Sequence, residues 1–129
     1  MALAEIVLAG VSRVGKTPLS IYLATLGWKV ANVPLIKDIR PPDELFQIDH
    51  RHVIGLTIEP GQLVLHRRQR ERHMGTPPLT SYTEAQASAE ELDYARALFR
   101  RGQFRIVDTT DKPIEEAAQE VLNIIHSPK

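Results

Sequence analysis

The feature that most constrains this chain is a turn near its start, Gly10-Val11-Ser12-Arg13-Val14-Gly15-Lys16-Thr17, which satisfies the pattern G-x-x-x-x-G-K-S/T in full. An almost continuously apolar segment, residues 3–9, precedes it and is typical of a buried parallel strand. The residues after it predict a helix ending near Gly27, with one apolar face made by Leu19, Tyr22, Leu23 and Leu26. A glycine-rich turn in this context predicts a phosphate-binding loop.

Each part of this turn has a chemical role. Gly10 and Gly15 allow backbone conformations barred to residues with a Cβ, so the loop can direct its N–H groups toward one anion. Lys16 supplies a positive charge for the β-phosphate region, and the Thr17 hydroxyl can ligate Mg²⁺. Arg13 can reach a phosphate or a partner, although an exposed surface position suits it nearly as well. The predicted nucleotide site is Gly10, Val11, Ser12, Arg13, Val14, Gly15, Lys16 and Thr17.

The rest of the chain alternates strand and helix patterns. Further strands are expected at residues 28–33, 53–58 and 104–107, with a long helix from about 83 to 101 and a last helix starting near Pro113. We therefore expect one domain over residues 1–129, with an α/β three-layer, P-loop kinase-like fold and a mostly parallel sheet. Residues 74–83 read as an exposed loop because they contain Gly75, Pro77 and Pro78.

Composition excludes several kinds of chemistry. Sixteen Lys and Arg balance sixteen Asp and Glu, so bulk attraction to nucleic acid is not expected. There is no cysteine, which excludes disulfides and thiolate metal sites. The apolar start contains Glu5 and lacks a basic region before it, so we expect neither a signal peptide nor a membrane span. We therefore expect the protein to be cytoplasmic.

Two further positions suggest phosphoryl chemistry. Residues 66–73 carry four arginines and one glutamate, and a helix would place Arg68 and Arg72 on one face. We expect Arg68 to neutralise charge on a transferring phosphoryl group, with a solvated face or a docking patch for an acidic partner as alternatives. Asp108 ends the fourth strand, where it can hold Mg²⁺ directly or through water, or cap the next turn.

Other candidates stay open at this stage. A general base is needed to accept the proton of an attacking hydroxyl, and the sequence does not rank the four acidic candidates, Asp38, Asp43, Glu59 and Glu84. Ser81 and Tyr82 lie in the expected loop, where they either touch a substrate or have no chemical role. The histidines lack the spacing of metal ligands.

Several segments together resemble the regulatory proteins of pyruvate, phosphate dikinase and phosphoenolpyruvate synthase. They are residues 10–13, 16–24, 29–35, 41–46, 53–58, 67–72, 81–82 and 107–118. The resemblance covers nearly the whole chain but only the carboxyl-terminal half of a family member, and the family usually has serine where this chain has Gly15. It implies a bifunctional regulator that phosphorylates a threonine of the target with ADP. The same regulator removes that phosphate with inorganic phosphate, releasing pyrophosphate.

The resemblance also implies the ligands and partners. ADP (or ATP), Mg²⁺ and inorganic phosphate are the expected small molecules, and the dikinase or the synthase is the expected protein substrate. Two alternatives share the loop: an ATP-dependent kinase of a small molecule or nucleotide, and a catalytically incomplete nucleotide-binding module that docks on a partner. Neither nucleic acid nor a membrane is an expected partner, and the oligomeric state is left open between monomer and homodimer.

Overall fold

The fold is built on a sheet of four parallel strands. The computed structural model describes the backbone of residues 4–74 and 81–126, and the side chains of residues 4–67 and 85–126. The strands are β1 (Ile6–Gly10), β2 (Val30–Pro34), β3 (Val53–Thr57) and β4 (Arg105–Asp108), in the spatial order β2-β1-β3-β4. Every residue of the central strands β1 and β3 is buried, which explains their continuous apolar runs.

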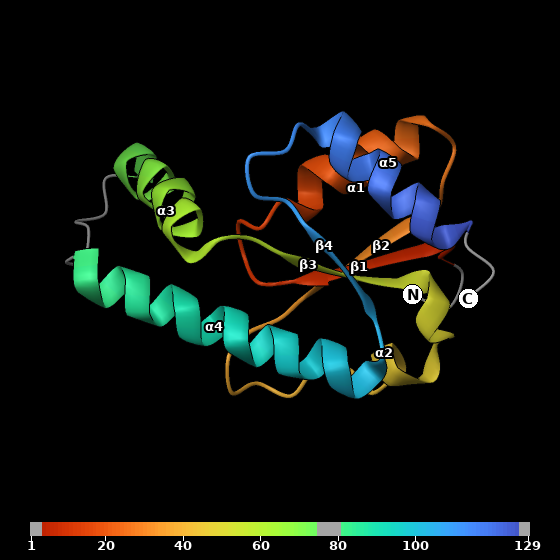
Figure 1. The fold of residues 1–129 in the computed structure, drawn as a ribbon, viewed down its shortest axis with the longest axis horizontal. Coiled ribbons are helices and arrows are strands. Elements are labelled where there is room, and N and C mark those ends of the chain that lie inside the picture. The colour runs from red at the N-terminus through yellow and green to blue at the C-terminus, as the bar shows by residue number, and fades with distance from the viewer. Residues whose placement is uncertain (1–3, 75–80, 127–129) are drawn as a thin grey trace.

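Helices cover both faces of this sheet (Figure 1). One face carries α1 (Lys16–Thr25) and α5 (Ile114–Ile125), which pack on each other. The other face carries α4 (Ser81–Gly102), and α3 (Pro60–Met74) packs against α4. Two short helices, α2 (Glu44–Gln47) and η1 (His50–His52), precede β3. The predicted three-layer α/β fold is therefore confirmed. Among the described residues, no helix has the length and apolar character of a membrane span.

Packing on the α4 face depends on a missing side chain in β3. A Cβ added at Gly55 would lie 2.6 Å from the Phe99 ring of α4, so the ring can approach the sheet only because residue 55 is glycine. On the opposite face, α1 buries Leu19 and Leu23, and α5 buries Val121 together with two alanines. The core therefore lies on both sides of β1 and β3, which makes these two strands the rigid centre of the fold.

The predicted elements agree with the structure, and some boundaries differ. The second strand begins at Val30, not Trp28, because the Trp28 N–H donates to the Leu23 carbonyl and closes the end of α1. The long helix begins at Ser81, two residues before its expected start. Met74 belongs to α3, so the expected loop is shorter than predicted, and its remaining residues 75–80 lie outside the described part of the chain.

The strand order determines where a ligand can bind. From β1 the chain moves to β2 on one side, and it then returns to place β3 on the other side of β1. Ligands of such sheets bind beyond the carboxyl ends of the strands at this reversal, here the ends of β1 and β3. The glycine-rich turn follows β1, so it lies at this position.

Candidate functional site: an anion-binding loop at the carboxyl edge of the sheet

The loop between β1 and α1 is turned by two residues with left-handed backbone angles. Gly15 has φ 107° and Arg13 has φ 66°. Gly15 thus has the conformation that the sequence predicted for it. Gly10 does not, because its φ is not positive. Its requirement is space: a Cβ there would lie 2.9 Å from Val14 Cγ1 and 3.2 Å from the Leu56 carbonyl oxygen.

The backbone N–H groups of this loop are free to bind an anion. Within the described residues, none of the N–H groups of residues 12–17 donates a hydrogen bond to a protein acceptor. They include the first N–H groups of α1, where a helix has donors without partners and a partial positive charge. Gly15 provides no side-chain cap for them. A run of unpaired N–H groups at a helix start is the usual protein site for a phosphate.

The Lys16 side chain folds back over the loop. Its Nζ donates to the Val11 carbonyl oxygen at 2.7 Å. Burial and, as the smaller cause, the positive charge of Arg67 together lower the pKa of Lys16 to about 8. Lys16 forms no ion pair with any carboxylate in the described part of the chain. The loop therefore holds a partly buried cation that lacks a negative partner.

A second cation, Arg67, reaches the loop from α3. Its Nη2 lies 3.0 Å from Ser12 Oγ and 3.3 Å from the Ser12 carbonyl oxygen, and its Nη1 pairs with Glu91 of α4. The sequence predicted this role for Arg68 instead, and the side chain of Arg68 lies outside the described residues. Helical spacing could have identified Arg67, because it follows the buried Leu63 by four residues and the buried Val64 by three.

The connection after β4 fastens the loop to the sheet. Thr109 Oγ1 donates to the Val14 carbonyl oxygen at 2.9 Å and also lies 3.2 Å from the Thr57 carbonyl oxygen. One hydroxyl thus links the anion-binding loop to the carboxyl end of β3. The Thr57 hydroxyl is buried and has no hydrogen-bond partner among the described residues.

Asp108 lies at the carboxyl end of β4, and β3 separates that strand from β1. Its Oδ1 accepts hydrogen bonds from the Thr110 N–H at 2.8 Å and the Thr110 hydroxyl at 2.5 Å, so it caps the following turn. Burial raises the pKa of Asp108, but the Thr110 hydrogen bonds and the charges of Lys112 and Arg96 outweigh it and lower the pKa overall. A carboxylate charged at neutral pH suits Mg²⁺, but a metal role for Asp108 stays a prediction.

The candidate bases occupy different places. Glu59 follows β3, the neighbour of β1, and its carboxylate accepts from the Gly61 and Gln62 N–H groups at 3.0 Å each, which caps α3. Asp43 pairs with Arg40 at the start of α2. Asp38 is exposed in a left-handed conformation, φ 65°. The side chains of Glu84, Ser81 and Tyr82 lie outside the described residues.

Thr17 is the other residue, besides Asp108, that the sequence predicts to hold Mg²⁺. Its exposed hydroxyl lies in the first turn of α1, and hydroxyl, phosphate and water oxygens are the ligands that Mg²⁺ prefers. In the described part of the chain, no cluster of three His, Asp or Glu side chains forms a metal site by itself. A metal here would therefore depend on oxygens of the nucleotide.

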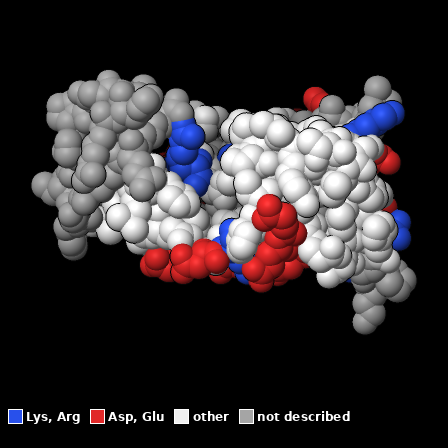
Figure 2. All heavy atoms as spheres, turned by 90° about the horizontal axis from the view of Figure 1, so that it is seen from above, with Lys and Arg blue, Asp and Glu red and all other residues white. Residues whose placement is uncertain are grey.

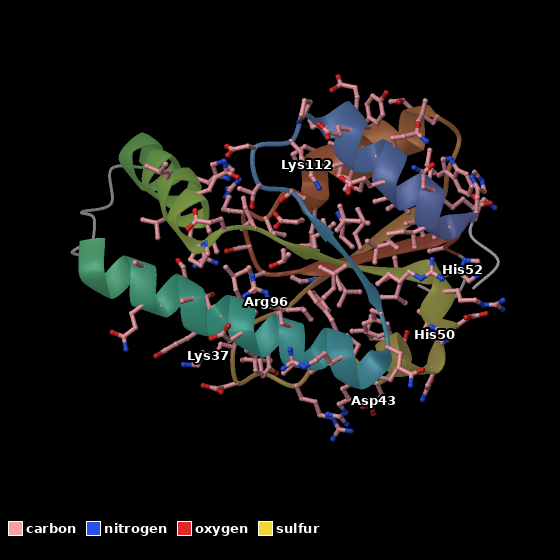
Figure 3. The ribbon with its side chains drawn as sticks, viewed as in Figure 1. Lys37, Asp43, His50, His52, Arg96 and Lys112 are labelled. Carbon is pink, nitrogen blue, oxygen red and sulfur yellow. The ribbon has the colours of Figure 1, made fainter. Side chains whose placement is uncertain are left out.

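A small pocket of about 140 Å³ adjoins the loop. The start of α1 contributes Gly15 and Pro18, and the β4–α5 side contributes Thr109, Lys112 and Ile114. His66 and further apolar side chains complete the wall. Lys112 lies beside the start of α5, whereas His50 and His52 lie at the opposite end of the sheet (Figure 3). On the face formed by α1 and α5, Lys and Arg atoms gather in a recess on the α3 side (Figure 2).

Comparisons with known proteins identify the family of this chain. A family model described as kinase/pyrophosphorylase matches residues 1–122. A relative from Chloroflexus aurantiacus is 52% identical over 95% of this chain and 44% of its own length. One from Geotalea daltonii is 50% identical over 92% and 45%. Both carry the provisional name pyruvate, phosphate dikinase regulatory protein. The chain thus spans less than half the length of these relatives.

Proposed function

This chain belongs to the kinase/pyrophosphorylase family, and we propose that it is the nucleotide-binding domain of a regulator of pyruvate, phosphate dikinase or phosphoenolpyruvate synthase. One observation carries this proposal: the N–H groups of residues 12–17, which donate to no protein acceptor among the described residues, lie in the same short loop as the partly buried Lys16. The names of the relatives support the dikinase as the target.

The proposed forward reaction uses ADP. The threonine oxygen of the target attacks the β-phosphorus, the bond from that phosphorus to the bridging oxygen breaks, AMP leaves, and the threonine proton passes to a base. In the reverse activity, an oxygen of inorganic phosphate attacks the phosphothreonine phosphorus, which frees the threonine and releases pyrophosphate. Because ADP has only two phosphates, the loop must grip the group that is transferred.

The proposed roles of the residues follow from their positions. The loop N–H groups and Lys16 bind the β-phosphate, and developing charge there is stabilised by donors that are already in place. Thr17, the phosphate oxygens and water would hold Mg²⁺, which would neutralise phosphate charge, with Asp108 as a further ligand through water. Arg13 and Arg68 would screen the remaining charge.

The pocket beside the loop suits the base of the nucleotide. Its walls are mainly apolar, and its volume of about 140 Å³ admits one ring system but not a whole nucleotide. We place the adenine there, with Lys112 at the rim of the pocket.

The second candidate is a nucleotide-binding module that docks on a partner without completing the reaction. The labelling experiment below distinguishes it from the first. An ATP-dependent small-molecule kinase shares the loop but has no separate support.

Intact-mass spectrometry tests the proposal. The purified chain is incubated with ADP, Mg²⁺ and the dikinase, and we expect one added phosphoryl group on the target, with Lys16→Ala giving none. ATP replaces ADP in a parallel reaction. A chain that binds ADP without labelling the target supports the docking module, and labelling that requires ATP contradicts the ADP-dependent reaction.

A further inference from the structure

The charges around the loop do not balance. Lys16 and Arg67 bring two positive charges to it, and Glu91, which pairs with Arg67, is the one carboxylate in contact with either cation among the described side chains. His66 also faces the loop, with its Nδ1 at 3.5 Å from the Arg13 carbonyl oxygen. Positive charge therefore exceeds negative charge here, and a bound anion with at least one negative charge would restore the balance.

Arg67 is held where such an anion would bind. Its side chain is 22% exposed and that of Glu91 is 26% exposed, so solvent screens this pair less than a surface ion pair. Both Nη atoms of the guanidinium donate to the Glu91 carboxylate, Nη2 also donates to Ser12 Oγ, and Nη1 lies 3.5 Å from Ser88 Oγ. Arg67 Nε is buried without a hydrogen-bond partner among the described residues. The donors next to the loop are the two Nη atoms, and they become available to a phosphate when the Glu91 carboxylate releases them.

We propose that Arg67 is a second phosphate-binding cation of this site, and that Glu91 is the counter-ion that holds it against Ser12 until a phosphate replaces the carboxylate. The inference rests on the proposed function, because it takes the loop to be a nucleotide site. A guanidinium suits this role since its planar set of N–H donors matches either a carboxylate or a phosphate. The contact to Ser12 already fixes the side chain at the loop, so exchange of partner needs only a small movement.

A purely structural role makes a different prediction. If the pair only ties α3 to α4, removing either partner lowers stability and changes phosphate affinity in the same direction. If Arg67 binds phosphate and Glu91 competes for it, removal of Arg67 weakens binding, whereas removal of the Glu91 charge strengthens it. Opposite signs from two residues of one ion pair therefore separate the two roles.

Calorimetric titration of the full chain with pyrophosphate, and separately with ADP, tests the proposal. We expect Arg67→Ala to weaken binding roughly 10- to 100-fold, as for loss of a charged hydrogen bond, and Arg67→Lys to weaken it less. Glu91→Gln keeps the shape of the side chain but removes its charge, and should tighten binding by about 2- to 10-fold. Arg51→Ala is the matched control, because Arg51 also pairs with a carboxylate, that of Asp49. Arg51 lies in η1, at the amino end of β3 and away from the loop.

The pH dependence gives a second readout. The charge of Arg67 lowers the Lys16 pKa, so Arg67→Ala should move the alkaline loss of ADP binding to higher pH. Arg13, His66 and Glu91 are the other described ionisable groups next to this pair, and the variant keeps all three residues. An unchanged profile would show that the charge of Arg67 does not act on Lys16, which contradicts the position of both cations at one site.

The outcomes separate the inference from the proposed function. If the unmodified chain binds neither ligand, the proposed function fails. If it binds, and Lys16→Ala abolishes binding, but Arg67→Ala remains within twofold of the unmodified chain, only the inference is overturned. Unchanged or weaker binding by Glu91→Gln also overturns it. Should Arg67→Ala fail to fold, Arg67→Lys decides: affinity and pH profile identical to the unmodified chain contradict the proposal.

Discussion

At the scale of single residues, the site is built from groups that cost stability in the absence of a ligand. Lys16 is a partly buried cation that pairs with no carboxylate among the described side chains, and Arg13 has a left-handed backbone conformation that residues with a Cβ rarely adopt. Such costs are typical of binding sites, because a bound anion recovers part of them. Two predictions belong to this scale.

The first prediction concerns the charge of Lys16. Its folded-state pKa of about 8 lies below its ordinary value of 10.5, so between these values the unfolded chain binds a proton that the folded chain does not. Stability from this group therefore rises with pH across that window and is lowest below pH 8. Lys16→Met should raise the melting temperature by a few degrees at pH 7, on the order of 1 kcal/mol after solvent screening, and by less at pH 9.5.

Differential scanning fluorimetry at the two pH values measures this effect. Lys29→Met is the control, because Lys29 is exposed on the surface. A lower melting temperature for Lys16→Met at pH 7 would show that the lysine stabilises the empty loop.

The second prediction separates strain from binding. Gly15 and Gly27 have similar angles, φ 107° and 96°, and a Cβ at either position meets no atom within 4 Å. Each Gly→Ala change should therefore cost about 1–2 kcal/mol of unfolding free energy through backbone strain alone. Only Gly15→Ala should also weaken ADP binding, because only Gly15 shapes the loop. Denaturant unfolding and ADP titration of both variants check this, and equal affinity losses would contradict it.

At the scale of elements, the site depends on how three strand ends are joined. The loop follows β1, Thr57 ends β3, and Thr109 follows β4 and bonds to both of the others. The Thr109 hydroxyl therefore holds the loop in place against the carboxyl end of the buried strand β3. The third prediction tests that link.

Thr109→Val keeps the shape of the side chain and removes the hydroxyl. We expect the unfolding free energy to fall by about 1 kcal/mol. ADP affinity should fall as well, because the Val14 carbonyl oxygen loses the hydrogen bond from Thr109 that holds the loop. Thr25→Val is the matched control, because among the described residues the Thr25 hydroxyl bonds only to the Tyr22 carbonyl oxygen within α1. If both variants lose stability and keep full ADP affinity, Thr109 is not a support of the site.

At the scale of the whole molecule, one prediction follows from the position of the loop between layers. The loop joins the sheet to α1 and, through Arg67, contacts α3. A ligand that binds there should therefore stabilise the fold as a unit. With ADP at 100 times its dissociation constant, linkage predicts about 2.7 kcal/mol and a rise in melting temperature of several degrees. Thermal melts with and without ADP measure it, and Lys16→Met should show no rise.

The amino-acid sequence alone determined the local features. The pattern of Gly15, Lys16 and Thr17 between an apolar strand and an amphipathic helix predicts the loop, because spacing and glycine content act over a few residues. The alternation of strands and helices predicts the α/β layers for the same reason. The apolar run of β1 also indicated a buried parallel strand.

Tertiary structure decided what depends on contacts between distant residues. Gly10 is needed because Val14 and Leu56 approach it, and the end of α4 turns at Gln103, φ 59°, although Gly102 is the glycine there. Arg67 reaches the loop because α3 packs on α4 and places Glu91 beside it. Strand order likewise places β3, not β4, next to the loop. These features arise when segments far apart in the chain pack together, and no local pattern encodes that packing.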